Sequence, residues 1–182
     1  MGPIAELFGA FSGLQLKFLR GGGAEVFDAL KRGESDLAVA GPLNEEWGRL
    51  DHWTLFEERF DLVVGQNHPL ARENRLTLEK LNGQPIVCLF GCESRDAVFE
   101  ELESRGMQPG FLHECGTQQD MAALVEAGIG VGFAPQSMRL RPGIRRVSVS
   151  DFMFTRKVSV YAVAGRKREA TANALLNLLR SS

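Results

Sequence analysis

The chain has 182 residues, 44% of them hydrophobic, and a formal net charge of -2 at pH 7. This length and apolar content suffice for a buried core in one or two small domains. The near-neutral charge excludes an evident nucleic-acid-binding surface. The sequence has no run of 18 apolar residues and no basic segment followed by an apolar leader, so neither a membrane partner nor secretion is expected.

Apolar periodicity predicts alternating helices and strands. Gly2-Pro3-Ile4 is typical of a turn that enters a helix, so the start is interpreted as a cut within a longer protein. The stretch 14–19 (LQLKFL) alternates apolar and polar residues and predicts a strand. Further strands are expected at 36–40, 55–65, 85–90, 111–114, 131–134, 146–151 and 158–164, with helices after 4, 23, 92, 117 and 170. The alternation predicts an α/β fold with a mainly parallel sheet.

The best specified segment is CGTQQDMAALVEAGIGVGFAP, residues 115–135. Thr117 can cap a helix, and Asp120 three residues later completes a capping-box pattern. Gly128 can end this helix before a buried strand at 131–134. Because a helix N-terminus beside strand ends can hold a small ligand, this segment is a candidate binding element.

Helix starts and strand ends of this kind supply the candidate ligand-binding residues. They are Gly2, Pro3, Gly22, Gly23, Gly41, Pro42, Gly91, Cys92, Gly116, Thr117 and Gln118. Backbone amides at such places can grip an anion without any side chain. Each place also has a plain structural explanation: a tight turn for the glycines, and a simple helix cap for Thr117.

Three cysteines, an odd number, argue against fully paired disulfides and favour reduced thiols in the cytoplasm. Cys92 stands at a predicted helix start, where the helix dipole raises the reactivity of a thiol, and Arg95 is close in sequence. A reversible redox sensor usually needs a resolving thiol. Cys88 is expected to be buried in a strand, and Cys115 is distant in sequence. A thiol that lines a ligand site is therefore favoured over a redox role for Cys92.

Other chemistry finds little support in the sequence. The histidines are isolated and no metal-ligand spacing occurs, so no metal site is expected. The glycines of 128–132 follow a helix and enter a strand, the reverse of a dinucleotide fingerprint, so no cofactor is expected. Glu57 and Glu58 are interpreted as a solvated strand edge rather than an acid/base pair. No nucleophile elbow surrounds a serine, so the chain is not expected to be an enzyme.

Three segments carry a resemblance to a known family. GESDLAVAGPL (33–43), ERFDLVVGQNHPLA (58–71) and ALVEAGIGVGFAP (123–135) resemble, in order and spacing, the effector-binding domain of LysR-type transcriptional regulators. The resemblance covers nearly the whole chain. It implies a type 2 periplasmic-binding-protein-like fold, with two Rossmann-like α/β lobes joined by two crossover strands. Lobe I would be residues 1–64 and 161–182, and lobe II residues 65–160.

The resemblance also implies a function. A small-molecule effector, with anions among the candidates, would bind in the cleft between the lobes and shift the population of two arrangements. DNA binding would belong to an N-terminal domain that this sequence lacks. The family pairs as homodimers or homotetramers, here through the helix faces near 26–30 and 121–125, although those faces can equally be core.

Two alternatives stay open beside this interpretation. The CExRD pattern at 92–96 resembles a LysR subgroup related to peroxide sensing, so a thiol sensor that uses Cys92 is one. A periplasmic solute-binding protein shares the architecture and is the other.

Overall fold

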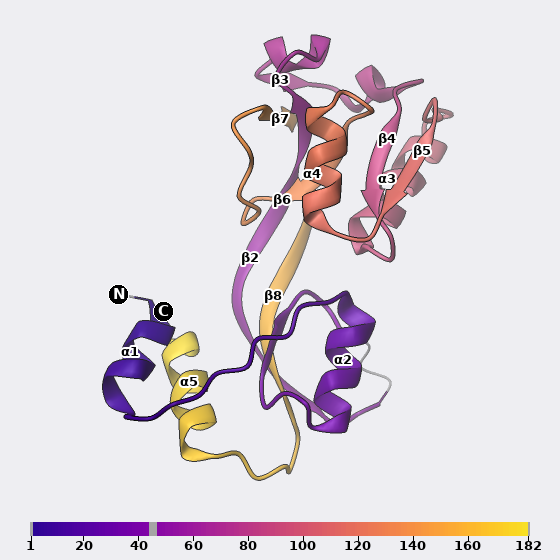
Figure 1. Ribbon diagram of the computed structural model, residues 1–182. Helices are drawn as coiled ribbons and strands as arrows, with labels where there is room; N and C mark the ends of the chain where they lie inside the picture. Colours follow the sequence, from indigo (N-terminus) through magenta and orange to yellow (C-terminus); the bar gives the residue numbers. More distant parts are fainter. Residues whose placement is uncertain (1, 44–46, 182) are drawn as a thin grey trace. The chain divides into compact units, whose positions relative to one another are not determined.

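The computed structural model describes residues 2–43 and 47–181. The chain divides into two compact units: unit 1 consists of Met1–Glu57 and Arg156–Ser182, and unit 2 of Glu58–Thr155. Two long neighbouring strands, β2 (Leu50–Gly65) and β8 (Phe154–Val163), pass from one unit into the other (Figure 1). The α/β fold with two crossover strands is therefore confirmed. The lobe boundaries predicted at 64/65 and 160/161 fall in these strands and stay a prediction.

Unit 1 forms a core between helix α2 and a pair of strands. Strand β1 pairs antiparallel with β8, so that Ala38 lies opposite Tyr161. Leu30 of α2 is fully buried against both. Helix α1 packs separately against α5 (Figure 1). The other elements of the unit are α1 (Pro3–Ala10), α2 (Gly23–Arg32), β1 (Ala38–Ala40) and α5 (Ala170–Arg180).

The strand predicted at 14–19 is wrong. This stretch has no assigned secondary structure, and the side chains of Phe18 and Leu19 are 70% and 44% exposed. A strand exists only where a neighbouring strand accepts and donates its backbone hydrogen bonds. Among the described residues no strand pairs with 14–19, so its alternating pattern has no sheet to join.

Unit 2 is built around the second half of β2. Strand β6 pairs antiparallel with one part of it, with Phe60 opposite Pro135, and β7 with another, with Leu62 opposite Val147. The further elements are η1 (Pro69–Arg72), β3 (Arg75–Leu76), η2 (Leu78–Leu81), β4 (Ile86–Leu89), α3 (Glu93–Ser104), β5 (Leu112–Cys115), α4 (Gln118–Glu126), β6 (Gly132–Pro135) and β7 (Ile144–Val149).

The expectation of a mainly parallel sheet is not met by the described pairings. The pairs β3–β7 and β4–β5 are parallel, whereas β1–β8, β2–β6 and β2–β7 are antiparallel. Two strands pair in parallel where a helix between them carries the chain back to the end of the sheet at which the first strand began, as α3 does between β4 and β5. The long strands β2 and β8 are not part of such a unit with β1, β6 or β7, and these three strands run antiparallel to them.

Strand β2 buries side chains on both of its faces. Leu62 and Val64 contribute to a cluster that includes Val98 of α3. Val63, on the other face, packs with Met121 of α4. Each of these three strand residues is at most 1% exposed. A strand covered on both faces explains the uninterrupted apolar run of Leu62, Val63 and Val64.

The glycine-rich run 128–132 serves packing and helix termination. Gly128 adopts φ +76° after α4, and the N–H groups of Gly128 and Ile129 donate to the carbonyls of Val125 and Leu124 in a Schellman motif. A Cβ on Gly132 would lie 2.7 Å from the carbonyl oxygen of Val87. The run therefore lets β6 approach β4 closely. Within the described part of the chain, no helix is long and apolar enough to cross a membrane.

Candidate functional site

The carboxyl ends of β4 and β5 bring two helix starts together within unit 2. The strands are parallel, with Leu89 opposite Cys115, and the Phe90 N–H donates to the Cys115 carbonyl at 2.9 Å. Helix α3 follows β4 after the short connection 90–92, and α4 follows β5 after residues 116–117. Five predicted residues therefore gather at one edge, which we call the strand-end site: Gly91, Cys92, Gly116, Thr117 and Gln118. Ligands of open α/β sheets bind at such edges.

Thr117 caps α4, as predicted. Its Oγ1 accepts a hydrogen bond from the Asp120 N–H at 3.1 Å and lies 2.6 Å from the Asp120 carboxylate. The Asp120 side chain thus binds the Thr117 hydroxyl, not the backbone N–H that a capping box requires. The hydroxyl thus donates one hydrogen bond and accepts another. The N–H groups of Gln118 and Gln119 have no acceptor in the part of the chain described by the structure.

Cys92 occupies the N-cap position of α3. Its Sγ lies 3.1 Å from the Oγ of Ser94, a residue only 6% exposed, and its side chain packs partly against the core of unit 2. Ser94 is not among the residues predicted for the site; its place two residues after Cys92, at a helix start, is the local signal for this contact. The thiol is thus anchored at the strand-end site.

The other two thiols are shielded. Cys88 is buried, as predicted, and burial followed by the charge of Glu114 raises its pKa. Cys115 donates weakly to the Cys88 carbonyl at 3.4 Å, and burial raises its pKa as well. All three cysteines are free. Because the thiolate is the reactive form, neither shielded thiol is a good resolving partner for Cys92.

Arg95 is committed to carboxylates. Its Nη1 donates to Asp96 at 3.0 Å, and its Nε lies 3.3 Å from Glu114. The Nε is buried, and the Glu114 contact lacks hydrogen-bond geometry, so that contact is electrostatic only. The positive charge expected to assist Cys92 is therefore offset by two anions.

The remaining predicted residues lie in unit 1. Gly2 is the N-cap of α1, whose first residue is Pro3, and its carbonyl accepts the Ala5 N–H at 2.9 Å. At α2 the Gly22 N–H donates to the Glu25 carboxylate at 2.9 Å, and Gly23 begins the helix. A carboxylate thus already stands at the start of α2 and competes with any anion there. Gly41 and Pro42 follow β1.

Glu58 is not on a solvated edge, so that expectation is wrong. It is 5% exposed, and its carboxylate accepts the Ser137 N–H at 2.9 Å. Its neighbour Glu57 is exposed, as alternation on a strand requires. Arg146 holds the same connection by donating to the carbonyls of Pro135 and Met138, and burial lowers its pKa. This carboxylate therefore has a structural role.

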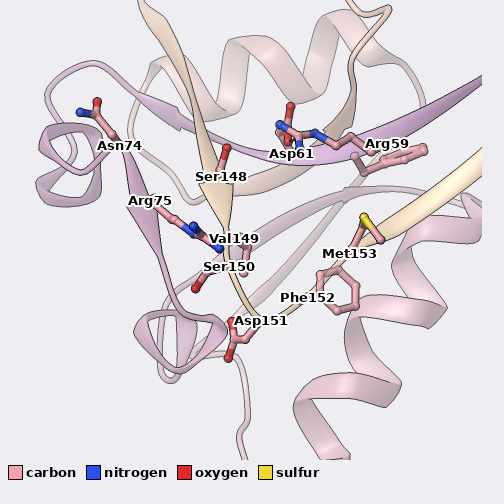
Figure 2. Close-up of a pocket in the computed structure, with 11 residues that line it drawn as sticks. Arg59, Asp61, Asn74, Arg75, Ser148, Val149, Ser150, Asp151, Phe152 and Met153 are labelled. Atoms are coloured by element: carbon pink, nitrogen blue, oxygen red, sulfur yellow. Dashed lines mark ion pairs between the residues drawn. The ribbon is translucent and has the colours of Figure 1, made fainter.

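A pocket of about 630 Å³ lies elsewhere in unit 2 and contains none of the predicted residues (Figure 2). It is bordered by 59–61 of β2, by 74–75 around the start of β3, and by 148–153 at the end of β7. We call it the β3–β7 pocket. Its walls come from three separate parts of the sequence, so no local pattern predicts it. Among the described residues, no group of three or more acidic, histidine or cysteine side chains is placed to hold a metal ion.

Comparison with known proteins gives a consistent picture. The family model "LysR substrate binding domain" matches residues 2–182. The chain is similar to the HTH-type transcriptional regulator CysB of Burkholderia cenocepacia, at 25% identity over 97% of this chain and 58% of that protein. It is also 24% identical to the HTH-type transcriptional regulator cbl of Klebsiella aerogenes, over 74% of this chain and 43% of that protein. The hydrogen peroxide-inducible genes activator of Haemophilus influenzae is likewise 24% identical, over 79% of this chain and 48% of that protein. The chain spans about half the length of the curated relatives it matches.

Solved structures share the fold. The regulatory domain of CcmR from Synechocystis PCC6803, in complex with 2-PG, matches with a TM-score of 0.83 at 17% identity, over 98% of this chain and 88% of that one. The effector-binding domain of QuiR in complex with shikimate matches with a TM-score of 0.80 at 16% identity, over 98% of this chain and 88% of that one. The BenM effector-binding domain with its effector benzoate matches with a TM-score of 0.73 at 20% identity, over 98% of this chain and 83% of that one. The predicted type 2 periplasmic-binding-protein-like fold is confirmed.

Proposed function

Since the chain belongs to the LysR substrate-binding domain family, we propose that it is the effector-sensing domain of a longer transcriptional regulator and has no catalytic activity of its own. The observation that carries this proposal is the strand-end site, where two helix starts converge at the carboxyl ends of parallel strands. DNA binding would lie in a segment outside this sequence. The cytoplasmic location predicted from the sequence belongs to the same proposal.

The ligand class follows from the donors at the strand-end site. The unpaired N–H groups of Gln118 and Gln119 and the positive end of the α4 dipole favour an anion. A carboxylate satisfies both donors at once. The shikimate and benzoate bound by QuiR and BenM are carboxylates, which supports this class. Asp120 places a carboxylate in the same first turn, where it binds the Thr117 hydroxyl and not a backbone N–H. A hydroxyl next to the ligand carboxylate could donate to Asp120 and offset the repulsion between the two carboxylates.

The predicted interlobe binding is part of the proposal. The same effector would contact Gly22 or Gly41 of unit 1 as well as the strand-end site, and would favour one arrangement of the units by its differential affinity. That preference is the allosteric signal. Its size is set by how much more tightly one arrangement binds the effector.

Pairing of the domain as a homodimer or homotetramer is also proposed. The helix faces predicted for it contain Leu30 and Met121, whose side chains are 0% and 1% exposed within their own units. These two residues belong to the cores. Pairing through α2 and α4 would therefore use the remaining, exposed sides of the helices.

A thermal-shift panel tests the proposal. The chain is heated with organic acids, amino acids and inorganic anions in parallel, and a binder present at 100 times its Kd adds about 2.7 kcal/mol of stability. The proposal expects a rise in Tm with at least one organic acid. A flat panel would refute it.

The thiol-sensor alternative is separated by mass spectrometry after mild peroxide. Reversible oxidation of Cys92 with a changed oligomeric state, together with a flat panel, would favour that alternative. The shielded positions of Cys88 and Cys115 predict that no reversible disulfide forms.

A further inference from the structure

The β3–β7 pocket has the features of a second binding site. We propose that it binds a small organic carboxylate with an alkyl or aromatic body, separately from the strand-end site. The proposal rests on the charges, the fixed walls and the size of this pocket, and it does not depend on the function proposed above.

The charged side chains that line the pocket differ in how far they are paired. The carboxylate of Asp61 is 3.1 Å from Arg59 Nε, and that of Asp151 is bound by Arg105 and by the Leu78 N–H at 2.8 Å. The side chain of Arg75, in contrast, has no hydrogen-bond or ion-pair partner among the residues that the structure describes. A ligand carboxylate could therefore pair with its guanidinium without displacing a protein partner. A guanidinium binds a carboxylate through two parallel N–H donors.

The position of Arg75 is fixed by strand pairing. In the parallel register of β3 and β7, Arg75 lies opposite Ser148. Both the N–H and the hydroxyl of Ser150 donate to the Leu76 carbonyl, at 2.8 and 3.0 Å, which fastens β3 to the end of β7. In the view of Figure 2 the Arg75 side chain points from β3 toward β7. The backbone from which the Arg75 side chain extends is thus held in place beside the pocket.

The apolar part of the pocket is also held in place. The ring of Phe60, a residue 5% exposed, meets Phe154 edge-on with centroids 5.1 Å apart. Phe152 meets Phe133 in the same manner at 5.6 Å. Rings locked by such contacts form a preformed wall. Together with a volume of about 630 Å³, within the usual range for small-molecule sites, this wall favours a carboxylate that carries an apolar body.

A titration followed by ¹⁵N–¹H correlation NMR tests the proposal. The probes are benzoate and hexanoate, with the neutral benzamide and hexanamide as matched ligands. We expect the carboxylates, but not the amides, to shift the backbone signals of Arg75 and of 148–153. In R75Q the Kd for the carboxylates should rise about ten- to a hundredfold, because the substitution removes a charge-assisted bidentate contact. R72Q, which changes an exposed arginine of η1 outside the pocket, should leave the Kd unchanged.

Several results would overturn the proposal. Equal shifts with the neutral amides, equal shifts with inorganic phosphate, or an unchanged Kd in R75Q would each do so. Shifts confined to Gln118 and Gln119 would place the carboxylate at the strand-end site alone and refute a second site. A well-dispersed spectrum of R75Q shows that the variant is folded, which is expected because Arg75 is exposed.

Discussion

Substitution of Gly132 by alanine should destabilise unit 2 substantially. The added Cβ would lie 2.7 Å from the Val87 carbonyl oxygen, closer than real Cβ contacts, and the obstacle is backbone that cannot rotate away. Strands β4 and β6 must then separate. The bonds at risk are Val87 N–H to the Val131 carbonyl at 2.7 Å and Val131 N–H to the Pro85 carbonyl at 2.9 Å.

The magnitude follows from these contacts. Overpacking of a rigid site costs about 1–3 kcal/mol, and weakening two backbone hydrogen bonds adds about 1 kcal/mol. For a domain of this size, about 2–4 kcal/mol corresponds to a fall in Tm of roughly 5–15 °C. The assay is urea unfolding followed by circular dichroism, with G116A as control, because a Cβ there meets nothing within 4 Å. Equal stability of G132A and G116A would refute the close-approach argument.

The other predictions concern single interactions, each measured by urea unfolding against a matched variant. T117A should lose about 1 kcal/mol because its hydroxyl caps α4, whereas T77A should lose almost nothing, since Thr77 makes no side-chain cap bond; equal losses would refute the cap. E58A should cost about 1–3 kcal/mol by removing the buried carboxylate that accepts the Ser137 N–H, since a hydrogen bond to a charged group is stronger than a neutral one. E57A should be nearly neutral, and a neutral E58A would contradict the structural role. The Leu78 N–H, and then Arg105, lower the pKa of the Asp151 carboxyl in the folded protein. The stabilisation that the Asp151 carboxylate gives the fold is therefore present above its ordinary pKa of 3.8 and is lost as the pH falls through the lowered value. D151N should be less stable than the parent at pH 7 and should differ less from it in strong acid, and a difference that widens in acid would refute this sign.

Local chemistry made much of the fold predictable. The helix after Thr117 and its termination at Gly128 are confirmed, because cap residues and left-handed glycines act through neighbours in sequence. The strand expected at 55–65 is confirmed as part of β2, and its apolar residues Leu62, Val63 and Val64 are buried. The gathering of Gly91, Cys92, Gly116 and Thr117 at one edge follows from two strand–helix units in parallel register.

Long-range partners account for what the sequence could not predict. The pattern at 14–19 is that of a strand, but a strand depends on a neighbour that no local pattern supplies. The acidic pair at 57–58 gave no sign that Glu58 is buried, because the acceptor role toward Ser137 joins residues 79 positions apart. The β3–β7 pocket was missed for the same reason, since Arg75 and the rings of Phe60 and Phe152 meet only after folding.

The central claim is that free backbone N–H groups at the start of α4 hold the effector. Gln118→Pro removes one of these donors at the first helical position, where proline is tolerated, and the extended backbone of Thr117 (φ -131°, ψ 154°) accommodates a following proline. A170P places proline at the first position of α5, after Glu169 in a similar extended conformation, and is the matched control. Isothermal titration with the strongest organic acid from the thermal-shift panel should show a Kd about ten- to a hundredfold higher for Q118P and unchanged for A170P. An unchanged Kd in Q118P, with the protein folded, would contradict the account.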